Sequence, residues 1–163
     1  MSIRRILEVL SLAGVLFTAW ITAAALYGPG GLPARIATHF DAAGNPNAWG
    51  ARGALLAVPL TAILLYILMS VVSRYPSAFN YPVQVTPRNR PRLEALALEM
   101  IAWLKVEIVW LFAWIQHITL ELARNGRGSL SRLFMPFVLA VVFATILTYV
   151  VAMRRVGKSN SSS

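Results

Sequence analysis

The sequence predicts an all-α integral membrane protein with four transmembrane helices, a long third helix and an ordered extracytoplasmic loop. Of its 163 residues, 58% are hydrophobic and only 13% are charged. Soluble domains carry about 25% charged residues, so this chain has too few charges to cover a surface in water. Four apolar stretches also reach the length of about 20 residues that a helix needs to cross the hydrocarbon.

The four predicted spans are residues 6–26, 54–72, 101–122 and 133–153 of one membrane domain, residues 1–158. The first is longer than the apolar region of about 7–15 residues in a signal peptide, so we expect it to be retained as a helix. The third belongs to a helical pattern that runs from about Leu93 to Arg124. At ~1.5 Å per residue this helix exceeds the hydrocarbon thickness. The polar tail, residues 159–163, is expected to be disordered.

The distribution of basic residues predicts the orientation. Nine of the 15 Lys and Arg residues lie near the termini or in the 73–92 loop, and five lie in the 27–53 loop or around the third interhelical segment. Cytoplasmic segments are enriched in Lys and Arg, so both termini and the 73–92 loop are predicted to be cytoplasmic. The remaining one, Lys105, is expected to extend to the cytoplasmic interface. The basic run from Arg88 to Arg92 is an expected topological anchor beside anionic lipid or a docking site for a partner.

The predicted extracytoplasmic loop, residues 27–53, holds several candidates for ligand or partner binding. Gly44-Asn45-Pro46 predicts a tight turn. Phe40 and Trp49 are of the kind that rests on a membrane interface or on helix ends. His39 and Asp41 stand beside them. Either these polar side chains bond backbone groups in a folded cap, or they contact a ligand.

The same loop carries a family resemblance. Between residues 32 and 50 it contains Leu-Pro followed by Thr-His-Phe-Asp-Ala-Ala-Gly-Asn-Pro-Asn-Ala-Trp-Gly. This pattern resembles the bacterial membrane family called domain of unknown function 1648, which also forms the first part of SdpI-type immunity proteins. A second, shorter match is Asn80-Tyr81-Pro82-Val83 with Thr86 and Asn89.

The resemblance implies a small multi-span protein of the bacterial cytoplasmic (inner) membrane. For the SdpI-type members it implies recognition of a secreted peptide toxin and sequestration of a cytoplasmic repressor. It supplies no catalytic residues.

The third predicted span has an unusual stripe of aromatic and ionisable side chains. Steps of three or four residues place on one helix face Glu99, Trp103, Glu107, Trp110, Trp114, His117 and Glu121. A charge in hydrocarbon costs about 2.5 kcal/mol or more, so such groups face a bundle interior or water. We therefore expect the stripe to face inward, with Glu107 protonated or paired with an arginine. Alternatively, Glu99 and Glu121 lie at the interfaces and the tryptophans pack.

A metal site is a further possibility at the outer face. The two histidines, His39 and His117, lie on the same predicted side of the membrane, and Asp41 and Glu121 complete a set of four possible ligands. The chain has no sequential metal motif, so structural roles are the alternative. Because the chain has no cysteine, disulfides, thiolate metal sites and Cys nucleophiles are excluded. The sequence itself predicts no cofactor.

Three functional hypotheses follow. The first is a non-catalytic accessory subunit or an immunity-like sensor of a ligand or peptide, with membrane lipids and either a membrane protein or a second copy as partners. The second is a metal- or haem-binding enzyme component that uses His39 and His117. The third is a proton or solute pathway through Glu107. The sequence does not decide whether the protein is an enzyme, although it shows no self-contained catalytic arrangement. Nucleic acid is not an expected partner despite the net charge of +9, because no basic helix or stacking motif is present.

Overall fold

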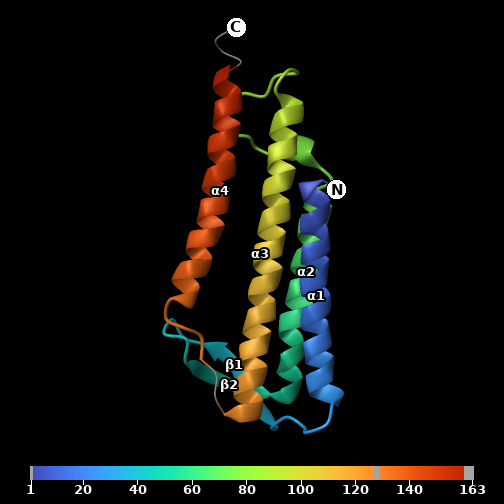
Figure 1. Ribbon diagram of the computed structural model, residues 1–163, viewed down its shortest axis with the longest axis vertical. Helices are drawn as coiled ribbons and strands as arrows, with labels where there is room; N and C mark the ends of the chain where they lie inside the picture. The colour runs from blue at the N-terminus through green and yellow to red at the C-terminus, as the bar shows by residue number, and fades with distance from the viewer. Residues whose placement is uncertain (1, 127–128, 160–163) are drawn as a thin grey trace.

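The computed structural model describes residues 2–126 and 129–159, which form four long helices and a small β-hairpin (Figure 1). The long helices are α1 (Ile3–Tyr27), α2 (Ala57–Val72), α3 (Arg90–Asn125) and α4 (Phe134–Ser159). The strands are β1 (Arg35–Phe40) and β2 (Pro46–Ala51), and two short 3-10 helices are η1 (Arg52–Leu56) and η2 (Pro76–Ala78). The chain is therefore mostly helical, as predicted, and a small two-stranded sheet that was not expected is added to the helices.

Among the residues that the structure describes, three helical segments are long and apolar enough to cross a membrane. They are Ile3–Tyr27, the continuous stretch Arg52–Val72, and Phe134–Lys158. α3, which carries several ionisable side chains along its length, is not among them. Its predicted extent, from about Leu93 to Arg124, is confirmed within three residues at each end. The expected disordered tail begins in fact within α4, which continues through Ser159, and residues 160–163 lie outside the described residues.

The 27–53 loop contains a β-hairpin that the sequence pattern does not predict. β1 and β2 are antiparallel, with Arg35 opposite Ala51 and Phe40 opposite Pro46. The expected turn is present, because the amide of Gly44 donates to the carbonyl of Asp41 at 2.9 Å. Gly44 has a φ of 83°, a backbone conformation that residues with a Cβ rarely adopt. The hairpin folds onto η1 and the ends of α1 and α3, because Ile36 packs there with three other buried apolar residues, Ala25, Leu55 and Leu120.

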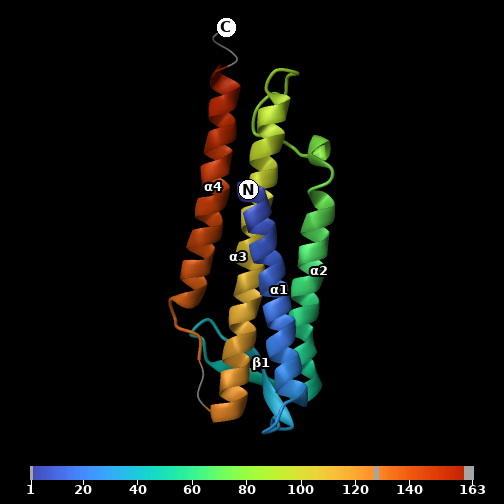
Figure 2. The same ribbon diagram turned by 45° about the vertical axis from the view of Figure 1, so that its right-hand side comes forward.

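α3 lies between two unequal groups of helices. α1 and α2 pack on one of its sides and α4 lies on the other (Figures 1 and 2). At the end opposite the hairpin, which we call the terminal end, α3 extends beyond α1. There it packs with α4 and the loop after η2 around a buried cluster, Leu93, Ala97 and Met153. Both described chain ends point toward the terminal end (Figure 1).

Candidate ligand-binding groove

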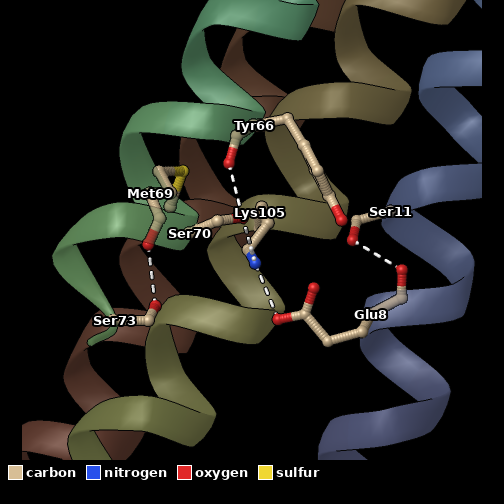
Figure 3. A network of polar contacts seen from close by, with 7 residues as sticks. All are labelled: Glu8, Ser11, Tyr66, Met69, Ser70, Ser73 and Lys105. Carbon is tan, nitrogen blue, oxygen red and sulfur yellow. Dashed lines mark hydrogen bonds and ion pairs between the residues drawn. The ribbon is translucent and has the colours of Figure 1, made fainter.

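Lys105 is the largest fully buried side chain of the described residues, and only 1% of it is exposed. It points from α3 toward α1 and α2 (Figure 3). Its Nζ donates to Oε1 of Glu8 at 2.6 Å and to Oγ of Ser70 at 3.0 Å, and it lies 5.0 Å from the ring centroid of Tyr66. The prediction that Lys105 extends to the interface is therefore wrong. An acid on a neighbouring helix keeps its ammonium group inside the bundle.

Sequence reasoning did not select Glu8, Ser70 or Tyr66, but a signal for the first was present. Glu8 and Lys105 are the third and fifth residues of two predicted spans, which begin far apart in the chain but at the same predicted side of the membrane. Opposite charges at similar depth on two spans favour an interhelical ion pair, because each would otherwise be desolvated alone.

A second polar cluster lies nearer the hairpin on the same face of α3. Gln116 is fully buried, and its Nε2 donates to Oγ1 of Thr22 at 2.7 Å and to the backbone carbonyl of Leu55 at 3.1 Å. The hydroxyl of Thr22 in turn donates to the carbonyl of Thr18 at 2.7 Å. One amide group thus joins α1, α3 and the start of the second apolar segment.

The stripe of aromatic and ionisable residues does not lie on this buried face. Trp103, Trp110 and Trp114 are 37%, 41% and 49% exposed. The stripe instead borders α4, because Oη of Tyr149 donates to Glu99 at 2.8 Å and Oγ1 of Thr145 donates to Glu107 at 2.5 Å. The expectation that the whole stripe faces inward is wrong. Glu107 bonds a hydroxyl group rather than the arginine that was one expected partner.

A groove of about 680 Å³ separates the middle of α3 from α4. Its α3 wall contains Glu107, Trp110 and Trp114, and its α4 wall is apolar. We call it the α3–α4 groove; its α4 wall consists of Phe134, Phe137, Val138, Val141 and Val142, and its rim at the hairpin end includes Ser129, Ser131 and Leu133. The volume is typical of sites for small ligands or for a few large side chains.

The polar character of the groove comes mainly from Glu107. Its Oε1 accepts the bond from Thr145, whereas its Oε2 is covered by neighbouring atoms and accepts no hydrogen bond from any described residue. An unpaired polar atom in an apolar surrounding costs free energy, so this carboxyl group has an unused capacity for one donor.

His117 and Glu121 continue the stripe beyond the groove. His117 is exposed, its ring centroid lies 5.7 Å from that of Trp114, and it lines a smaller hollow of about 280 Å³ with Phe17 and the tryptophans. Glu121 accepts a hydrogen bond from Nδ2 of Asn125 at 2.9 Å.

The candidate residues of the loop stay together on the hairpin. His39 is exposed and its Nδ1 lies 2.5 Å from Oδ1 of Asn47. Asp41 accepts a hydrogen bond from the amide of Asn45 at 2.9 Å, which closes the turn. Trp49 is about half exposed, and Phe40 is half-buried beside a small cavity of about 130 Å³. The hairpin therefore presents His39 and Trp49 to the surroundings and uses Asp41 in its own turn.

The four possible metal ligands have separate contacts. Within residues 2–126 and 129–159, no three His, Asp or Glu side chains are grouped so that they could hold a metal ion. The structure thus brings together the hairpin residues in one place and the groove residues in another, without joining His39 to His117.

Comparison with known proteins identifies one segment of the chain. Residues 14–63 match a domain of unknown function (DUF1648). This match confirms the resemblance that the loop motif predicted. The DUF1648 segment covers most of α1, the whole hairpin and the first part of α2, so it supplies both groups that bond Gln116. The α3–α4 groove and Glu8 lie outside it. No curated protein and no solved structure matches the chain.

Proposed function

We propose that this protein is a non-catalytic accessory subunit of a bacterial cytoplasmic membrane, with four transmembrane helices and both termini in the cytoplasm. Four crossings are supported by the three apolar helical segments and by the length of α3. They are also supported by the two described chain ends, which both point toward the terminal end. The bias of basic residues toward the same end supports the orientation. Reporter fusions after Asn45 and Gly126 should behave as external, and fusions after Thr86 and Lys158 as internal. A reversed pattern would contradict the orientation.

The α3–α4 groove carries the functional part of the proposal. It is an apolar hollow on the outside of the bundle and contains one carboxyl group, that of Glu107. In the proposed four-crossing arrangement this group lies inside the hydrocarbon region. Lipid chains fill apolar space, but they bring no hydrogen-bond donor to that depth. A transmembrane helix of a partner brings both an apolar surface and a Ser, Thr, Asn, Gln or Lys side chain, and such polar groups hold membrane helices together.

The partner helix in this proposal packs against Trp110 and Trp114 and donates a hydrogen bond to Glu107. Oε2 of Glu107 is covered by neighbouring atoms. The donor of the partner therefore bonds Glu107 either after the carboxyl group rotates or by displacing the hydroxyl of Thr145 from Oε1. The exposed His39 and Trp49 of the hairpin then contact the extracytoplasmic part of the same partner. In an immunity-like variant of this function, the partner is a secreted peptide.

Site-specific photo-crosslinking in intact membranes tests this function. A photoreactive amino acid in place of Trp114 should crosslink to one polypeptide segment that carries a donor side chain. The matched position is Leu64, 64% exposed on α2, where the same probe should give lipid adducts. Glu107→Leu should remove the polypeptide product at position 114. A product of twice the chain mass would identify the partner as a second copy, and lipid adducts alone at position 114 would overturn the proposal.

A further inference from the structure

A second cavity, of about 550 Å³, lies at the terminal end between α4 and the loop after η2. Arg154 and Lys158 of α4 line one of its sides, and Gln84, Thr86 and Asn89 line the other. It is separate from the α3–α4 groove, which lies nearer the hairpin and has no basic residue among its described lining residues.

The loop wall of this cavity is held in place by one buried amide side chain. Asn89 is only 3% exposed, its Nδ2 donates to the carbonyl of Gln84 at 3.0 Å, and its Oδ1 accepts from the amide of Thr86 at 2.8 Å. The amide of Asn89 also donates to the hydroxyl of Thr86 at 3.3 Å. These bonds close residues 84–89 into a compact turn, so the wall is formed before any ligand binds.

A glycine on α4 brings that loop close to the helix. A Cβ at Gly157 would lie 2.7 Å from Cγ1 and 2.8 Å from Cβ of Val83. Such distances are too short for carbon atoms, so a larger residue would push the loop away. The closeness of the two walls therefore depends on a residue without a side chain.

The charge of the cavity is positive. Arg154 and Lys158 are four residues apart and project from one face of α4, and the described lining includes no carboxylate. An arginine guanidinium binds phosphate oxygens with two parallel hydrogen bonds, and a lysine ammonium binds them as a point charge. The hydroxyl and amide groups of the loop are suited to the remaining oxygens.

The cavity lies just beyond the apolar part of α4. The predicted span ends at residue 153, and Arg154 is the next residue. Lipid phosphates lie at this level of a membrane. We infer that this cavity binds the phosphate of an anionic phospholipid whose chains run along α4. The inference uses the proposed membrane placement of α4 but not the proposed role of the groove.

Native mass spectrometry of the full-length protein in detergent tests the inference. Phosphatidylglycerol and phosphatidylcholine are offered at equal concentration, and inorganic phosphate is offered in a separate titration. The wild type should retain one phosphatidylglycerol in preference to phosphatidylcholine. The double variant Arg154→Gln, Lys158→Gln should weaken that binding roughly 25-fold, or about fivefold for each basic residue removed. Arg155→Gln is the matched control, because it removes the same charge from an exposed residue outside the cavity lining.

The controls distinguish a site from general attraction. Gly157→Val should also weaken binding without changing any charge, while a thermal unfolding measurement reports that the helices remain folded. An equal loss for Arg154→Gln and Arg155→Gln would show diffuse attraction only and would overturn the inference. Equal retention of the two lipids would also overturn it. If inorganic phosphate displaces the lipid at micromolar concentration, the ligand is a soluble phosphate and the lipid assignment is wrong. Partner crosslinking at position 114 should be unchanged in the double variant, so failure here and failure of the proposed groove function are distinguishable.

Discussion

The two sides of α3 use opposite kinds of residue for helix contact. Toward α1 and α2, the helix presents small residues, such as Ala102 and Ala113, and the two polar side chains Lys105 and Gln116, all buried. Toward α4 it presents tryptophans that remain 37–49% exposed, and one of them, Trp110, also reaches α1, where its Nε1 donates to the carbonyl of Leu10 at 3.1 Å. Small residues let backbones approach closely, whereas indole rings hold a neighbouring helix away and leave a hollow beside them.

This comparison shows that charge alone does not mark the exposed side of α3. The side with the buried lysine is the closely packed one, because Glu8 and Ser70 satisfy its ammonium group. The aromatic side is apolar enough for lipid, yet it has a carboxyl group with an unused acceptor. Interhelical pairing, rather than hydrophobicity, decides which side is packed.

The largest expected effect is on the ion pair between the buried Lys105 and the partly exposed Glu8. Glu8→Ala removes the acid and leaves the ammonium of Lys105 with Ser70 as its remaining hydrogen-bond partner. We expect a loss of about 3 kcal/mol in the free energy of unfolding, the low end for a buried pair, because Lys105 is buried but the Glu8 side chain is 44% exposed. Glu8→Gln should cost less because an acceptor oxygen remains. The measurement is unfolding in detergent followed by tryptophan fluorescence.

Glu94→Ala is the control for this pair. It breaks the more exposed contact between Glu94 and Arg90, with 3.7 Å between the charged atoms, and should cost less than about 1 kcal/mol. Adding Lys105→Met to Glu8→Ala should restore much of the lost stability. Equal losses for Glu8→Ala and Glu94→Ala would mean that the packed side of α3 is not specially dependent on charge pairing.

The next effect concerns the close approach of α1 to α3. A Cβ at Gly14 would lie 2.8 Å from Cγ1 of Val109, so Gly14→Leu forces the two helices apart and should cost about 1–3 kcal/mol. The neighbouring Ala13 is exposed, and Ala13→Leu should stay within about 0.5 kcal/mol of the wild type. Thermal unfolding of both variants gives the comparison. If Ala13→Leu were the more damaging, α1 would be rotated relative to the described packing.

A smaller effect is expected where α4 meets the aromatic side. The hydrogen bond from Thr145 to Glu107 should contribute about 0.6 kcal/mol, the average for polar pairs between membrane helices. The contribution is small because a threonine hydroxyl can rebond to a carbonyl of its own helix. A double-mutant cycle of Glu107→Leu and Thr145→Val measures it. A coupling energy as large as that between Glu8 and Lys105 would remove the difference between the two sides.

The smallest effect is expected at the terminal end, where α4 does pack closely on α3. Burial raises the pKa of Tyr81 above 10, the Glu94 carboxylate raises it further, and Arg90 lowers it. Since the folded pKa is the higher one, this stabilising contribution is complete below about pH 10 and is lost as pH rises through the raised pKa. The ultraviolet absorbance titration of the wild type, minus that of Tyr81→Phe, isolates this group.

Two charge variants check the cause of that shift. Glu94→Gln should bring the Tyr81 transition to lower pH, and Arg90→Gln should move it to higher pH. A transition at pH 10 in the wild type would indicate that the loop after η2 is not packed on α3 in solution.

Several features of this structure are readable from the sequence because they depend on neighbours along the chain. Three of the predicted spans begin within three residues of the starts of apolar helical segments, the extent of α3 is nearly correct, and Gly44 forms the expected turn. Which face of α3 points toward α1 and α2 cannot be predicted from neighbours along the chain. The stripe spacing identified a face correctly, but its direction depends on Glu8 and Gly14 of another helix. The hairpin was missed because its strands are short and lack a regular alternation of apolar and polar residues.

The turn of the hairpin also holds the segment that precedes α4 in place. The amide of Leu130, just before α4, donates to the carbonyl of Gly44 at 2.9 Å, and a Cβ at Gly44 would overlap the Leu130 carbonyl. At its other end, α4 is fixed by Met153 in the buried cluster with Leu93 and Ala97. Because α4 is held near both of its ends, the distance between α3 and α4 can increase at the middle of α4 only if α4 bends. The α3–α4 groove can therefore widen at its middle while its two ends stay closed, which limits what it admits to something inserted sideways from the membrane.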